Sequence, residues 1–190
     1  MARITSINAR IIHNSRGSKT IEVDVISDNQ YLGRTSAPSG ASVGKYEAVS
    51  FPENGPEQSL RILNENSEKF LEFESSDLKS IDETLKSIDK TSDYSKIGGA
   101  LAYAVTIASV ESAAKASGKQ LFELISEQNE YRFPIPIGNI LGGGAHAGPG
   151  TPDIQEILIS APSAKTIRDA IETNFAVHNE LRNVIEKTDP

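Results

Sequence analysis

The sequence contains no cysteine. Disulfides, thiolate metal sites and cysteine nucleophiles are therefore excluded, and any metal ion must be bound through oxygen or imidazole groups. This composition is compatible with a reducing compartment, and we expect the protein in the cytoplasm.

Long apolar runs and basic clusters are also missing. No stretch approaches the roughly 20 apolar residues of a membrane span, and the first twelve residues lack the apolar core and cleavage site of a signal peptide. The chain has 26 acidic and 19 basic residues, which gives a formal net charge of −7. This balance argues against nucleic acid or an anionic membrane as the main partner.

The remaining composition is typical of a globular protein. Hydrophobic residues make up 37% of the chain and charged residues 24%, which predicts a folded protein with a modest core rather than a disordered one. A length of 190 residues exceeds the usual single-domain size of about 100 to 150 residues. One and a half domains is therefore as plausible as one.

The N-terminal residues show a nearly alternating apolar pattern, which predicts short strands at residues 4–11, 21–25 and 31–35. A polar segment with a glycine, residues 14–18, separates the first two strands, and Asp28 and Asn29 form the next turn. Three strands in series predict an antiparallel meander. The following residues, 38–44, are rich in glycine and serine, and we expect a mobile loop there.

From Pro56 the apolar period becomes helical. The pattern predicts one helix with an apolar face that extends to Leu71, and a second with Ser76 as its N-cap. A long alanine-rich helix at residues 97–117 and a short one at 121–126 follow. The expected fold class for this part is α+β, a three-stranded meander followed by a helical cluster.

Composition shifts again at residues 132–136, where two prolines open an apolar strand, residues 135–140, that ends in the glycines 142–144. A second strand at residues 154–159 and a final helix from Ile167 to Ile185 follow. We therefore expect a first domain at residues 1–131 and a second unit at 132–190. A strand-strand-helix piece cannot cover both faces of its strands, which indicates the start of an incomplete α/β barrel.

Several motifs resemble one family in order and approximate spacing. They are Ser15-Arg16-Gly17 with residues 20–25, the loop at 38–48 (PSGASVGKYEA), and the segment at 143–148 (GGAHAG) with Ile154-Gln155-Glu156. The chain resembles the N-terminal region of the enolases, including the start of their barrel domain, over essentially its whole length. Departures are Asn14, Lys19 and Ala100, where the family usually has aspartate, proline and asparagine.

The resemblance implies a Mg²⁺-dependent carbon–oxygen lyase of glycolysis, phosphopyruvate hydratase. Such an enzyme interconverts 2-phosphoglycerate and phosphoenolpyruvate by removing a proton next to a carboxylate, which requires nearby cations. By resemblance, Ser42 would ligate the second Mg²⁺ ion, while Gly40 and Ala41 in the same loop would contact the substrate. Without the flanking match, the same residues would be interpreted as an ordinary turn.

Three further site residues follow from the resemblance. His146 would approach the substrate phosphate, Gln155 would line the substrate pocket, and Glu156 would act catalytically in the acid–base cluster near the leaving hydroxyl. Without the resemblance, His146 would be interpreted as an ordinary histidine in a loop, and Glu156 as an ordinary acidic residue in a strand. The glycine triplet lacks both a following Lys-Ser or Lys-Thr and a Gly-x-Gly-x-x-Gly pattern, so we exclude ATP and NAD as ligands.

The family's general acid, its principal Mg²⁺ carboxylates and its two catalytic lysines correspond to positions after Pro190. We therefore expect the isolated chain to be inactive and the full-length enzyme to form a homodimer. Two alternatives remain open. The chain could be a natural short, non-catalytic interaction module, or it could belong to a related acid-sugar dehydratase, which the surroundings of Ser42 and His146 disfavour.

Overall fold

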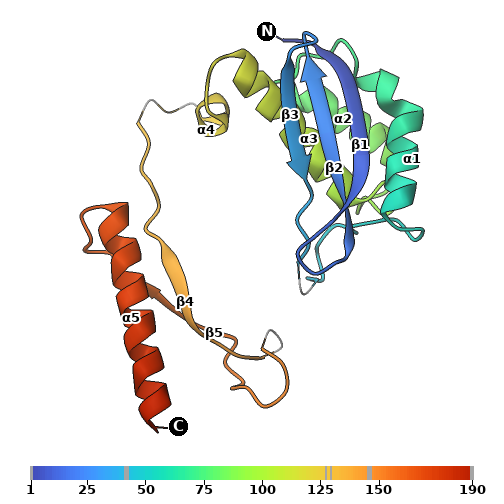
Figure 1. Ribbon diagram of the computed structural model, residues 1–190. Coiled ribbons are helices and arrows are strands. Elements are labelled where there is room, and N and C mark those ends of the chain that lie inside the picture. The colour runs from blue at the N-terminus through green and yellow to red at the C-terminus, as the bar shows by residue number, and fades with distance from the viewer. Residues whose placement is uncertain (1, 41–42, 127, 129, 145–146, 189–190) are drawn as a thin grey trace. The chain divides into compact units, whose positions relative to one another are not determined.

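The computed structural model describes residues 2–40, 43–126, 128, 130–144 and 147–188. The chain divides into two compact units, residues 1–128 and 129–190 (Figure 1). Each unit is described by itself.

The first unit is built on a three-stranded antiparallel sheet in the order β1-β2-β3, which confirms the meander. Its strands are β1 (Ile4–His13), β2 (Lys19–Ser27) and β3 (Tyr31–Ser36). Alternation along β2 buries Ile21, Val23 and Val25 on one face. The β2–β3 turn places Asp28 and Asn29 at φ values of 51° and 55°, a left-handed conformation that these residue types tolerate.

Apart from the short last helix, the helices of this unit lie on one face of the sheet (Figure 1). Their bounds are α1 (Pro56–Asn66), the 3₁₀ helix η1 (Ser67–Phe70), α2 (Leu78–Asp89), α3 (Gly99–Ala116) and α4 (Leu121–Ile125). A single hydrophobic core joins the sheet to α1, η1, α2 and α3. Its largest fully buried side chains include Phe70, Ile4, Ile21, Ile81, Leu85, Ile97 and Leu101.

The alanine-rich helix α3 packs directly on the backbone of β3. A Cβ atom at Gly33 would lie 1.8 Å from the carbonyl oxygen of Ala108 and 2.6 Å from the amide nitrogen of Ser112. The Ser112 hydroxyl donates to the carbonyl oxygen of Tyr31 over 2.7 Å. Small residues on both elements therefore set the distance between helix and sheet.

Three predicted helix boundaries were wrong for local reasons. The α-helix α1 ends at Asn66, whose side-chain amide donates to the carbonyl oxygen of Ile62, and a 3₁₀ turn carries Phe70. The N-cap of α2 is Asp77 rather than Ser76, because the Asp77 carboxylate accepts the amide hydrogen of Ser80.

The third boundary is the start of α3, which begins at Gly99 rather than at residue 97. The buried carboxylate of Asp89 accepts hydrogen bonds from the amides of Lys96 and Ile97, at 3.1 and 2.8 Å. These bonds hold both residues outside the helix, and Gly98 follows with a φ of +89°.

The second unit contains the antiparallel strands β4 (Ile137–Gly142) and β5 (Glu156–Ser160), followed by helix α5 (Ile167–Thr188). Both strands start later than predicted. Residues 132–136 are irregular, because Pro134 and Pro136 have no amide hydrogen for a sheet ladder.

The two-stranded sheet is open, as expected for the beginning of a barrel. In the described part of this unit, Ala170 is the one fully buried hydrophobic residue. Ile137, Leu158 and Phe175 keep 68%, 53% and 65% of their surface exposed. The unit therefore leaves apolar surface of both the sheet and the helix uncovered. In the described ranges, no helix is long and apolar enough to cross a membrane.

Candidate active site

The first group of predicted site residues lies just after β3. The amide of Ala37 donates to the carbonyl oxygen of Ile21, and the buried Thr20 hydroxyl donates to the carbonyl oxygen of Ala37, both at 3.0 Å. The chain leaves the sheet there and reaches Gly40. Ala41 and Ser42, the other two predicted residues of this loop, lie outside the described residues.

Gly40 lines a cavity of about 360 Å³ at the N-terminal end of α3. The segment from Glu47 to Ser50 forms part of its wall, together with Ala100 and Tyr103 of the helix. This segment is fixed to α3 by its backbone, since the amides of Gly99 and Ala100 donate to the carbonyl oxygens of Val49 and Ser50. The predicted loop therefore borders a hollow whose walls are held in place.

Sequence reasoning missed the contact that fastens this loop to the sheet. The guanidinium of Arg16, in the β1–β2 turn, donates to the carbonyl oxygens of Ser39 and Gly40, at 2.7 and 3.4 Å. The available signal was a long cationic side chain in a turn between an asparagine and a glycine. Nothing in the local pattern indicated its target, which lies more than twenty residues away.

The second group of predicted residues lies at the start of β5. Glu156 is the first residue of that strand, pairs with Gly142 and is exposed. The carbonyl oxygen of Gln155 accepts the amide hydrogen of Gly143 over 2.8 Å. A Cβ atom at Gly143 would lie 2.3 Å from the carbonyl oxygen of Ile154. The glycines after β4 thus allow the two chain segments to approach closely beside Gln155 and Glu156.

The loop between β4 and β5 is closed at its base by hydrogen bonds. The amide of Gly144 donates to the carbonyl oxygen of Pro152 over 2.7 Å, and the Thr151 hydroxyl donates to that of Gly148 over 2.7 Å. The sequence had given Thr151 no role. His146 belongs to this loop but lies outside the described residues. The structure therefore brings Gln155 and Glu156 to the glycine segment and leaves the position of His146 a prediction.

The described residues do not themselves fit a metal ion. Among them, no group of three or more histidine, aspartate or glutamate side chains is arranged to hold one. The one metal ligand predicted within this chain, Ser42, is not among them.

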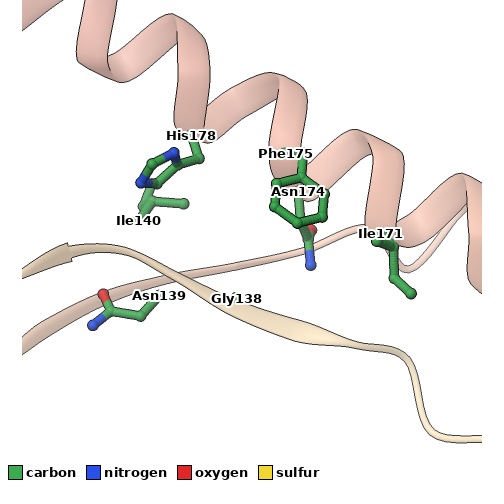
Figure 2. Close-up of a pocket in the computed structure, with 7 residues that line it drawn as sticks. All are labelled: Gly138, Asn139, Ile140, Ile171, Asn174, Phe175 and His178. Atoms are coloured by element: carbon green, nitrogen blue, oxygen red, sulfur yellow. The ribbon is translucent and has the colours of Figure 1, made fainter.

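A separate hollow of about 300 Å³ lies between β4 and α5 (Figure 2). Ile171, Phe175 and His178 project from the helix toward the strand, where Ile140 lies opposite (Figure 2). The Asn174 amide donates to the carbonyl oxygen of Pro136 over 3.1 Å. Gln155 and Glu156 do not line this hollow. The apolar residues that line this hollow belong to the uncovered face of the open unit. We assign no function to His178.

The strongest charge cluster lies on the face of the sheet opposite the core. Asp24 accepts hydrogen bonds from Arg34 Nε at 2.6 Å and from Arg10 Nη1 at 2.8 Å. Arg10 also pairs with Glu22. Hydrogen bonds from Arg34 and Arg10 lower the pKa of Asp24 to about 2. Every carboxylate and guanidinium in this cluster is paired. The cluster therefore stabilises the sheet and does not provide a general acid or base for catalysis.

Comparison with known proteins covers both units. The profile of the enolase N-terminal domain matches residues 4–125, and that of the enolase C-terminal TIM barrel domain matches residues 130–189. An α+β domain followed by the beginning of a TIM barrel domain, in this order, defines an enolase-type protein. The chain belongs to the enolase family.

Similar curated proteins carry the name enolase. The enolases of Methanosphaera stadtmanae and Methanothermobacter thermautotrophicus are each 39% identical to this chain over 98% of its length, which is 45% of theirs. The enolase of Halorubrum lacusprofundi is 37% identical over 98% of this chain and 46% of its own. The chain thus spans about half the length of the curated relatives it matches.

Proposed function

We propose that this chain supplies the N-terminal domain and the first barrel elements of an enolase, with the boundary between residues 131 and 132. The full-length enzyme would catalyse the reversible, Mg²⁺-dependent dehydration of 2-phosphoglycerate to phosphoenolpyruvate in glycolysis. The observation that carries this proposal is that both enolase domain profiles match in order, together with relatives that are 36–39% identical across nearly the whole chain. We extend the proposal to a cytoplasmic homodimer.

In this enzyme the residues of the present chain bind and orient the substrate. Gly40 and Ala41 would contact it, Ser42 would supply one oxygen toward the second metal ion, and His146 would approach the phosphate. Gln155 lines the pocket. The exposure of Glu156 at the first position of β5 leaves its carboxylate free to take part in proton transfer at the leaving hydroxyl.

The principal metal ligands and the base that removes the substrate proton would come from outside this chain. The open second unit supports the same view, because its strands and helix keep apolar surface that further barrel elements would cover. The isolated chain is therefore proposed to be inactive.

The test compares the full-length enzyme with the isolated chain, using 2-phosphoglycerate and Mg²⁺ and following the ultraviolet absorbance of phosphoenolpyruvate. Full-length enzyme should turn over 2-phosphoglycerate and leave sugar acids unchanged, whereas the chain should match a blank. Turnover by the highly purified chain would contradict the proposed inactivity. A full-length enzyme that dehydrates sugar acids but not 2-phosphoglycerate would contradict the proposed substrate.

A further inference from the structure

The contact between Arg16 and the loop that contains Gly40 joins two segments that are distant in sequence. One guanidinium nitrogen of Arg16 lies 2.7 Å from the carbonyl oxygen of Ser39, and the other lies 3.4 Å from that of Gly40. Hydrogen bonds from a charged donor are stronger than neutral ones, and the planar fork of arginine fixes the direction of both. The backbone is thus held where it enters residues 41–42.

The β1–β2 turn is built to present the Arg16 side chain. The Asn14 carboxamide oxygen accepts the amide hydrogens of Arg16 and Ser18, at 2.9 and 3.0 Å. The amide of Gly17 donates to the carbonyl oxygen of Asn14, and Gly17 has a φ of +75°. These bonds fix the backbone of Arg16, so its side chain loses less conformational freedom on reaching the loop.

The other end of the same short span is also fixed. The carbonyl oxygen of Ala37 accepts the buried hydroxyl of Thr20. Next, Pro38 has a restricted φ, which limits the directions that the backbone can take as it leaves the sheet. In the described part of the chain, the path from Ala37 to Gly40 therefore has one anchor on the sheet and a second at Arg16.

We infer that Arg16 is a positioning residue for the substrate-binding loop: its guanidinium sets the backbone of Ser39 and Gly40 so that Gly40 meets the substrate. Arg16 does not itself contact the reacting atoms in this role. The inference rests on the proposed function of Gly40, but the anchoring can be measured without catalysis.

The anchoring is measured by limited trypsin digestion of the 190-residue chain. Lys45 is exposed in the same loop region, and the exposed Lys119, beyond α3, serves as an internal reference. In Arg16→Ala, the rate of cleavage after Lys45 relative to that after Lys119 should rise about tenfold, because the loop opens more often when its anchor is lost. Arg61→Ala, at an exposed position on α1, is the matched control and should leave the ratio unchanged.

Arg16→Lys separates charge from geometry. Lysine keeps the positive charge but lacks the fork, so this variant should recover part of the protection. A cleavage ratio in Arg16→Ala equal to that of the unsubstituted chain would overturn the inference. If Arg16→Ala unfolds globally, both cuts become fast and the ratio in Arg16→Lys decides: a ratio above that of the unsubstituted chain supports the inference, and an equal ratio overturns it.

The positioning role is measured in the full-length enzyme. Arg16→Ala should lower kcat/KM for 2-phosphoglycerate by about tenfold, mainly through KM, because Gly40 contacts the bound substrate. Faster cleavage with unchanged kinetic constants would also overturn the inference. An unsubstituted full-length enzyme without activity would contradict the proposed function instead, and the cleavage ratio would still decide the anchoring.

Discussion

At the scale of single residues, two carboxylates show how environment separates stabilising groups from candidate catalytic ones. Asp24 lies between Arg10 and Arg34 on the sheet, and its pKa is lowered to about 2. Glu156 is exposed at the start of β5, beside the glycines that follow β4. The Asp24 carboxylate is therefore paired with two arginines, whereas the exposed Glu156 carboxylate can reach a ligand.

Glu156 is expected to affect turnover more than folding. In the full-length enzyme, Glu156→Gln should lower kcat by roughly 10² to 10⁴, the usual contribution of general acid–base catalysis, with a much smaller change in KM. Glu186→Gln, at an exposed position on α5, is the matched control and should leave kcat unchanged. Steady-state kinetics with 2-phosphoglycerate measure both, and an unaltered kcat in Glu156→Gln would remove this residue from the acid–base cluster.

Asp24 should contribute to stability in a pH-dependent way. Its folded pKa is lowered, so its contribution is fully present above the unfolded pKa of about 4 and is lost as the pH falls toward 2. Asp24→Asn should therefore lower the free energy of unfolding at pH 7 by at most about 2 kcal/mol. Denaturant unfolding at pH 7 and at successively lower pH measures this, and a stability difference that grows on acidification would contradict the assignment.

The sequence predicted most of the site residues only through motif context. Gly40, Gln155 and Glu156 occur in the described structure at the loop after β3 and at the start of β5, while Ala41, Ser42 and His146 lie outside it. Arg16 could not be given a role from its neighbours, because its partners at Ser39 and Gly40 become adjacent only when the sheet forms. Local patterns carry no information about such long-range hydrogen bonds.

At the scale of elements, periodicity identified the strands and helices but not their ends. The meander and the helix order follow from apolar alternation and the change to a helical period at Pro56. The ends depend on individual side chains, such as the Asp77 carboxylate at the start of α2 and the buried Asp89 carboxylate before α3. Where a serine and an aspartate are adjacent, the sequence does not decide which of them is the N-cap, since both residue types cap helices.

The packing of α3 on β3 gives the sharpest prediction at this scale. Gly33→Ala would place a Cβ atom 1.8 Å from the carbonyl oxygen of Ala108, so the helix must shift away from the sheet. Overpacking of this kind typically costs about 1 to 3 kcal/mol, and backbone contact places this case at the upper end. Gly44→Ala is the matched control, because its nearest neighbour, a side-chain carbon of Glu47, lies at 3.6 Å. In thermal unfolding, Gly33→Ala should have a lower melting temperature than Gly44→Ala. Equal melting temperatures of the two variants would contradict the close approach of helix and strand.

At the scale of the whole molecule, the two units differ in how completely they cover their apolar surface. The first unit encloses a continuous core between the sheet and the helices. The second leaves Ile137, Leu158 and Phe175 largely exposed. The first should therefore unfold as a cooperative unit, whereas the strands of the second must dock elsewhere, pair between chains or fray.

Hydrogen exchange on a strictly monomeric sample of the 190-residue chain tests this difference most directly. The amides of residues 21–25, at the centre of the buried sheet, should exchange only through global unfolding of their unit. Those of residues 154–159 should exchange much faster, because the sheet that contains β5 is open and has little buried surface to protect it. Equal protection of the two segments would mean that the chain has a closed fold of its own, and would contradict the view that its second unit is the beginning of a larger barrel.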